Sequence, residues 1–117
     1  MTEQTQQFEH TDSSGELVRA VALDEVPENG AVGVVIGGRP IAIVRSNGQI
    51  YAIHDVCSHA QVALSEGEID DGTIECWLHG SRFDLATGRP TGLPATEPVP
   101  VYRTKIEGDA VYVAVNP

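Results

Sequence analysis

The sequence predicts an all-β domain built from antiparallel sheets. Apolar runs rich in β-branched residues alternate with two-residue turns: Gly37-Gly38 separates Val32–Ile36 from Ile41–Val44, and Asn47-Gly48 precedes Ile50–Ile53. Asn-Gly between such runs is a strong hairpin signal, because both central residues of the turn must adopt positive φ. No stretch has the sustained 3.6-residue periodicity of an amphipathic helix. These observations favour a small sandwich or barrel.

The rest of the chain continues this pattern of strands and turns. Asp71-Gly72 separates two short runs, and Gly108-Asp109 joins Val101–Ile106 to Val111–Val115. Alternate residues of a strand share one face, so the valines of the last run are expected to lie together. Val18–Leu23 is compatible with a helix, but its β-branched content favours a strand.

The first sixteen residues differ in composition from the others. Segment 1–16 is polar, with Phe8 as its one large apolar side chain, so we expect a polar N-terminal tail and one folded domain over 17–117. The N-terminus lacks the basic and apolar regions of a signal peptide, and no apolar run approaches the ~20 residues of a transmembrane helix. We therefore expect a cytoplasmic protein that does not enter a membrane.

The charge balance excludes one class of partner. The chain has 17 Asp and Glu against 7 Lys and Arg. Binding of nucleic acid requires a basic face, so a nucleic-acid partner is not expected, nor is an anionic membrane surface. The acidity either keeps the protein soluble or attracts a basic partner protein, and charge alone does not decide between these.

Two short boxes carry the chemistry of this sequence. The first box is Cys57-Ser58-His59 and the second box is Cys76-Trp77-Leu78-His79. They contain both cysteines and two of the four histidines of the chain. Sixteen residues lie between the boxes, and the predicted Asp71-Gly72 turn is among them, so the chain can fold back and bring the boxes together. In a reducing compartment such cysteines are ligands or thiols more often than a disulfide.

The two boxes resemble the cluster-binding loops of the Rieske proteins. Segment Cys76–Asp84 is similar to the second of those loops, and Gly92–Thr96, with Pro94, resembles the proline-bearing loop that covers the cluster from a third side. The resemblance extends over nearly the whole predicted domain. It implies a Rieske-like fold in which two loops form a cluster-binding subdomain.

The resemblance also implies a cofactor, one [2Fe–2S] cluster. One iron would be held by two cysteines and the other by two histidines: Cys57, Cys76, His59 and His79. Neutral imidazoles reduce the net negative charge, so the family spans about −150 to +300 mV, against about −400 mV for all-thiolate plant-type clusters. The resemblance further implies an electron carrier rather than an enzyme. It would accept electrons from a flavin-dependent ferredoxin reductase and deliver them to a terminal enzyme such as a non-haem iron oxygenase.

Residues around the boxes depart from the high-potential Rieske proteins. Those proteins carry one more Cys in each loop, and the matching positions here are Val62 and Leu78, which cannot form a disulfide. They also have a Ser and a Tyr whose hydroxyls donate hydrogen bonds toward cluster sulfurs. Ser81 is present, but Phe83 has no hydroxyl. Trp77 stands where Pro is common, and either packs against the loop or marks a docking surface.

Other interpretations of the boxes remain open. Two Cys and two His suit a zinc-stabilised interaction module, although their alternating order is unusual for zinc fingers and favours the cluster. A disulfide between the two cysteines is a third possibility, disfavoured by the compartment. Within the Rieske family, the alternatives to a ferredoxin are a nitrite reductase small subunit and an accessory protein of iron–sulfur assembly. Many nitrite reductase subunits lack the ligands, and all four are present here.

An acidic run lies between the boxes. It contains no Lys or Arg and comprises Glu66, Glu68, Asp70, Asp71 and Glu75. It is either a solvated hairpin or a docking patch for a basic reductase or oxygenase.

Three further polar residues flank the boxes. We expect His54 to be an ordinary, partly buried histidine and not a ligand. Asp55 and Asp84 are expected either to cap loop amides or to tune the field at the site.

The missing hydroxyl at Phe83 predicts a low reduction potential for this class. Hydrogen bonds to cluster sulfurs stabilise the reduced state, so losing one lowers the potential. Voltammetry at neutral pH should give a value in the lower half of the range of about −150 to +300 mV. A potential at the upper end, with the respiratory proteins, would contradict this expectation.

Overall fold

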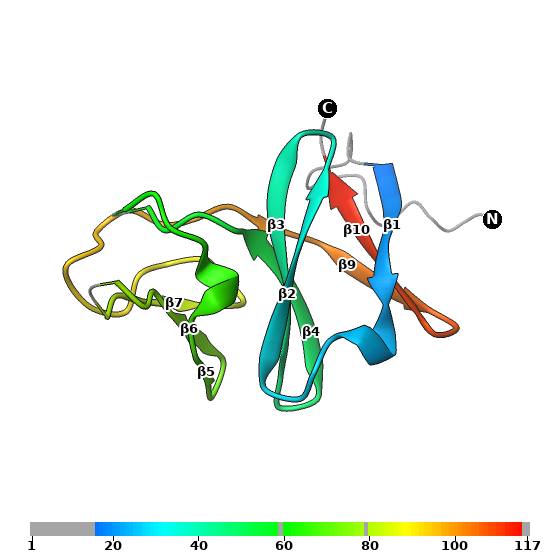
Figure 1. Cartoon of the computed structure of the whole chain (residues 1–117), viewed down its shortest axis with the longest axis horizontal. Coiled ribbons are helices and arrows are strands. Elements are labelled where there is room, and N and C mark those ends of the chain that lie inside the picture. Colours follow the sequence, from blue (N-terminus) through cyan, green and yellow to red (C-terminus); the bar gives the residue numbers. More distant parts are fainter. Residues whose placement is uncertain (1–15, 59, 79, 116–117) are drawn as a thin grey trace.

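Short antiparallel strands account for most of the described chain (Figure 1), which confirms the predicted all-β class. The computed structural model describes residues 16–58, 60–78 and 80–115. The strands are β1 (Glu16–Ala22), β2 (Gly30–Ile36), β3 (Arg39–Ser46), β4 (Gln49–His54), β5 (Ile69–Asp70), β6 (Thr73–Glu75), β7 (Arg82–Asp84), β8 (Val101–Tyr102), β9 (Thr104–Glu107) and β10 (Ala110–Val115). Two single-turn 3₁₀ segments are η2 (Leu23–Glu25) and η3 (Leu64–Glu66). Among the residues that the structure describes, no helix has the length and apolar character that crossing a bilayer requires.

The central sheet has the order β2-β3-β4-β8, and its two hairpins are those predicted. Gly37 and Gly38 have φ of 59° and 81°, and Asn47 and Gly48 have φ of 53° and 78°. Positive φ at both central positions gives the turn a twist that matches the twist of the paired strands. Local turn chemistry therefore sets the register of this sheet.

The second sheet has the order β1-β10-β9 and contains the strand predicted near the N-terminus. Strand β1 begins at Glu16, so the rest of the predicted tail lies outside the described residues. Val111, Val113 and Val115 of β10 all pack in one buried cluster, as their alternation predicted.

The prediction of one strand over Val101–Ile106 is wrong. The segment divides into β8, which pairs with β4, and β9, which pairs with β10. Arg103 lies between them, and its carbonyl oxygen accepts a hydrogen bond from Ala114 N–H at 2.9 Å. The chain changes sheets at this residue, and one straight strand cannot extend the edges of two sheets at once.

Two apolar cores lie on opposite faces of the central sheet. The basal core, between the two larger sheets, contains the buried residues Val21, Val26, Ile41, Ile43, Ala52, Val111, Val113 and Val115. The loop core contains Ala42, Val44, Ile53, Cys57, Leu64, Ile74, Cys76, Phe83, Leu85, Ala95 and Val99. Alternate residues of β3 thus enter different cores, which explains the unbroken apolar run of this strand: both of its faces are buried.

The third sheet, β5-β6-β7, is small and stands apart from the larger two (Figure 1). Its first turn is the predicted Asp71-Gly72, with φ of 48° and 79°. Gly72 N–H donates to the buried Ser46 hydroxyl at 3.0 Å, and Asn47 Nδ2 donates to Asp71 Oδ1 at 3.2 Å. These bonds attach the small sheet to the β3–β4 hairpin. Strand β7, which the sequence did not predict, completes the frame of the second box.

Candidate metal centre

The first box is separated from β4 by two residues, Asp55 and Val56, and its loop is closed by a backbone hydrogen bond. Cys57 N–H donates to the carbonyl oxygen of Val62 at 3.0 Å, which closes a loop between these residues. The carboxylate of Asp55 accepts two hydrogen bonds from Ser65, at 2.6 Å from the backbone N–H and 2.7 Å from the hydroxyl. The buried Asp55 thus caps the backbone amide of Ser65 in η3, just beyond this loop, which is one of its two expected roles.

The second box is the connection between β6 and β7. Cys76 N–H donates to the carbonyl oxygen of Ser81 at 2.6 Å, and Gly80 N–H donates back to the carbonyl oxygen of Cys76 at 2.9 Å. Gly80 has φ of 81°, a conformation that favours glycine. The loop therefore turns tightly within one residue after the box. Asp84, just beyond it, accepts from Ala86 N–H at 3.2 Å, so it also caps a loop amide.

The two cysteines lie in the same apolar surroundings. Cys57 is 2% exposed and Cys76 is 0% exposed, and both belong to the loop core. They are not joined by a disulfide. His59 and His79 lie outside the described residues. The boxes thus present one buried thiol from each of two loops, and the predicted meeting of the boxes is confirmed for their cysteines.

A third loop connects to both boxes. Ser81, 0% exposed, accepts a hydrogen bond on its hydroxyl from Ala95 N–H at 3.1 Å. Ser58 Oγ of the first box donates to the carbonyl oxygen of Glu97 at 2.6 Å. Pro94, which directly precedes the buried Ala95, is exposed and follows a cis peptide bond. The segment predicted as a proline-bearing loop is therefore hydrogen-bonded to the loop of the second box through Ala95, and the residue that follows the segment, Glu97, is bonded to the first box.

The remaining predicted neighbours divide into buried and exposed groups. Phe83 is fully buried in the loop core, and Val62 packs against that core. Trp77 and Leu78 are 52% and 41% exposed. The second box therefore turns its cysteine inward and its two central side chains toward solvent. Trp77 was expected either to pack against the loop or to mark a docking surface, and its exposure favours the docking surface.

The acidic run is less uniform than the sequence indicated. Glu75 Oε1 lies 3.4 Å from Arg82 Nη2 across the β6–β7 pair, so this carboxylate has a cation beside it. Glu66, Glu68, Asp70 and Asp71 are all exposed, and we call these four residues the acidic hairpin. Sequence reasoning missed the Glu75–Arg82 contact because the two residues meet only through strand β7, which was not predicted.

The fold and the paired thiol loops define a small domain that binds either an iron–sulfur cluster or zinc. Comparison with known families distinguishes between these two kinds of site. Residues 16–103 match the family model described as the Rieske [2Fe-2S] domain, which is most of the chain. The chain belongs to the Rieske [2Fe-2S] domain family, and the corresponding cofactor is a [2Fe–2S] cluster.

Individual members of this family that are similar to the chain include ferredoxins of dioxygenase systems. The anthranilate 1,2-dioxygenase ferredoxin subunit of Burkholderia cepacia is 44% identical over 95 residues, which cover 81% of this chain and 88% of that protein. The ferredoxin of carbazole 1,9a-dioxygenase from Nocardioides aromaticivorans IC177 superimposes with a TM-score of 0.80 at 36% identity, covering 84% of this chain and 96% of the other.

Two further solved structures bear on partners and alternatives. A complex of reduced oxygenase and oxidised ferredoxin in carbazole 1,9a-dioxygenase contains a chain with 33% identity and a TM-score of 0.79, covering 86% of this chain and 94% of that one. A nitrite reductase small subunit from Mycobacterium tuberculosis has a TM-score of 0.79 at 22% identity, covering 88% of this chain and 97% of the other. The second likeness shows a shared fold and nothing more.

The donor chemistry of the described residues fits such a cluster. Iron–sulfur clusters are held by thiolates, and two buried cysteines on facing loops are available for that purpose. Within the described ranges, no group of three or more His, Cys, Asp or Glu side chains is placed to hold a metal ion. The described residues thus supply two thiols to the site, and His59 and His79 lie outside the described ranges.

The buried Ser81 hydroxyl should contribute measurably to the stability of the site. Ser81→Ala leaves the Ala95 N–H, in a buried place, without its acceptor, and an unsatisfied buried donor costs about 1–3 kcal/mol. Urea unfolding followed by circular dichroism should show that loss. Thr91→Ala is the control, because its hydroxyl makes an exposed 3.4 Å bond to Arg82 O and should change stability by less than about 0.5 kcal/mol. Equal stability of the two variants would contradict the role given to Ser81.

Proposed function

We propose that this protein is the ferredoxin component of a ring-hydroxylating oxygenase system, carrying single electrons from a flavin-dependent reductase to a terminal oxygenase. The observation that carries the proposal is the pair of buried thiols, one on each of two loops, in a domain of the Rieske family. Relatives named as ferredoxin components support it, because the chain covers 88% and 96% of the length of two of them.

The proposed ligands are the four box residues: Cys57, Cys76, His59 and His79. The buried thiolates suit the inner iron, and each histidine follows its cysteine by two or three residues, which leaves it on the same loop. A [2Fe–2S] cluster with this ligand set supplies one-electron chemistry at a potential above that of all-thiolate clusters. The chain's part is to hold the donors, exclude water on the core side and leave the loop tips open.

The surroundings of the boxes suit an electron carrier rather than an enzyme. The side chains at the loop tips are large, apolar and exposed: Trp77, Leu78 and Leu93, which is 79% exposed. Exposed apolar side chains beside a buried donor set favour transient contact with another protein. The site therefore has a packed inner side and an outer side suited to contact with a redox partner.

Metal analysis and histidine variants test the proposal together. Purified protein should contain two irons and two acid-labile sulfides per chain, and the reduced protein should give an EPR spectrum whose average g is below that of all-thiolate clusters. His59→Ala and His79→Ala should each lose that spectrum. His54→Asn is the matched control, since His54 ends β4 just before the first box and should keep the spectrum. Zinc in place of iron would contradict the proposal.

The acidic hairpin is the proposed docking element for a basic partner. Glu66 ends η3, Glu68 lies between η3 and β5, Asp70 ends β5 and Asp71 is in the turn that follows. Glu68 is next to the second box, because its carbonyl oxygen accepts a hydrogen bond from Glu75 N–H at 2.8 Å, whereas Asp70 and Asp71 are at the other end of β6. The small sheet and η3 lie on the same side of the central sheet (Figure 1). Opposite charge on a partner raises the rate of encounter by steering, and the effect weakens as salt increases. The hairpin would thereby bring a partner to the end of the molecule that carries the thiol loops.

Charge reversal at the hairpin tests this role. Glu68→Lys with Asp70→Lys should lower the second-order rate of reduction by a purified flavin reductase of a dioxygenase system about tenfold at low ionic strength, and should reduce the salt dependence. Asp71 is left unchanged because it has positive φ and bonds Asn47. Asp24→Lys with Asp109→Lys is the control, because η2 and the β9–β10 turn lie at the opposite end of the molecule (Figure 1). Equal rates for the two double variants would remove the docking role.

A further inference from the structure

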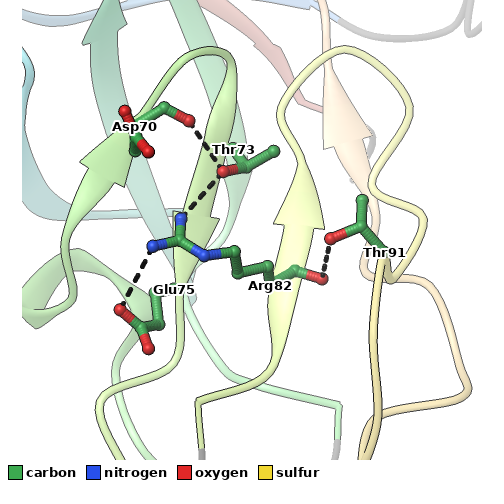
Figure 2. A network of polar contacts seen from close by, with 5 residues as sticks. All are labelled: Asp70, Thr73, Glu75, Arg82 and Thr91. Atoms are coloured by element: carbon green, nitrogen blue, oxygen red, sulfur yellow. Dashed lines mark hydrogen bonds and ion pairs between the residues drawn. The ribbon is translucent and has the colours of Figure 1, made fainter.

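An ion pair closes the base of the second box. Glu75 is the last residue of β6 and Arg82 the first of β7, and they are paired directly across the two strands. The box and the Cys76-to-Ser81 hydrogen bond lie immediately beyond this pair. Figure 2 shows the Arg82 side chain lying back across the strands toward Glu75 and Thr73.

The Arg82 guanidinium is held by two partners. Nη2 lies 3.4 Å from Glu75 Oε1, and Nη1 donates to Thr73 Oγ1 at 2.9 Å (Figure 2). The Thr73 hydroxyl in turn donates to the carbonyl oxygen of Asp70 at 2.8 Å. Both charged side chains are about one-third exposed, at 33% and 31%. The cation therefore has a defined position that the forked shape of arginine makes possible.

The second oxygen of the Glu75 carboxylate lies against the box itself. A Cβ added to Gly80 would meet Glu75 Oε2 at 3.5 Å, which places that oxygen beside the Gly80 backbone. Glu75 directly precedes Cys76, and Gly80 directly follows His79. This carboxylate thus comes from the residue before one proposed ligand of the loop and lies near the residue that follows the other.

A charge in this place affects how easily the site accepts an electron. Reduction adds negative charge, so a nearby carboxylate opposes it and a nearby cation favours it. Partial exposure leaves these charges less screened than charges in open water. A carboxylate at Gly80 without a cation would lower the potential, and Arg82 offsets that effect.

We propose that Arg82 is a positioning residue for the second box. Arg82 holds the Glu75 carboxylate in place and compensates its charge, so that the pair helps to set the reduction potential. This inference rests on the proposed function, because it requires a redox centre at the box. It assigns the pair a role beyond joining two short strands.

Midpoint potentials of charge variants test the inference. A spectroelectrochemical titration at pH 7 should show a downward shift for Arg82→Gln, an upward shift for Glu75→Gln and a value close to the parent for the double variant. Arg82→Lys retains the charge and should recover most of the potential, even if it lowers the melting temperature. If Arg82→Gln fails to fold, the midpoint potential of Glu75→Gln still tests the inference, because the pair can set the potential only if that variant shifts it upward.

The Lys105–Glu107 pair provides a matched control. Its charged atoms are 3.2 Å apart on β9, in a sheet that does not contain the second box. Lys105→Gln and Glu107→Gln change the net charge equally and should shift the potential much less. Unchanged potentials in all Arg82 and Glu75 variants, with lowered melting temperatures, would overturn the inference and leave a structural role only. Absence of iron and sulfide from the parent protein would instead contradict the proposed function.

Discussion

The structure of the site depends on two backbone hydrogen bonds, each donated by a cysteine. Cys57 N–H closes the first box on Val62, and Cys76 N–H closes the second box on Ser81. A bond from the cysteine's own amide fixes its backbone, and burial in the loop core fixes the side-chain environment. The thiols are therefore oriented by the fold before any ligand is considered, which reduces the ordering that metal binding must impose.

The larger sheets provide the rigid support that these loops need. Strand β3 sends alternate side chains into the basal core and the loop core, so the packing of each core restrains the other. Strand β4 leads into the first box, and the β3–β4 turn is hydrogen-bonded to the small sheet that carries the second. The two boxes are far apart in the chain, but the strands that carry them pack on the same loop core and are therefore held together.

Local signals predicted much of this architecture, and non-local pairing explains what they missed. The turns at Gly37-Gly38, Asn47-Gly48 and Asp71-Gly72 were predictable because positive φ depends on the residues of the turn itself. The division of Val101–Ile106 was not, because it depends on which sheet edge each half meets.

The candidate site shows the same contrast. The thiol positions followed from the spacing of the boxes, since two cysteines and a turn between them are visible in the chain. The bond between Ser81 and Ala95 and the contact between Glu75 and Arg82 were not predicted, because both depend on the three-dimensional course of strands and loops. Such contacts join residues that are distant in the chain, so they can be recognised only in the folded structure.

The central claim is that the two thiols, one from each loop, bind the same iron, and that nitrogen ligands bind the second iron of the cluster. Mössbauer spectroscopy of the oxidised protein, grown with ⁵⁷Fe, tests this most directly because both irons are then ferric and differ only in their ligands. The account predicts two unlike ferric sites in equal amounts. Two equivalent sulfur-ligated irons, or a single isolated iron, would contradict it.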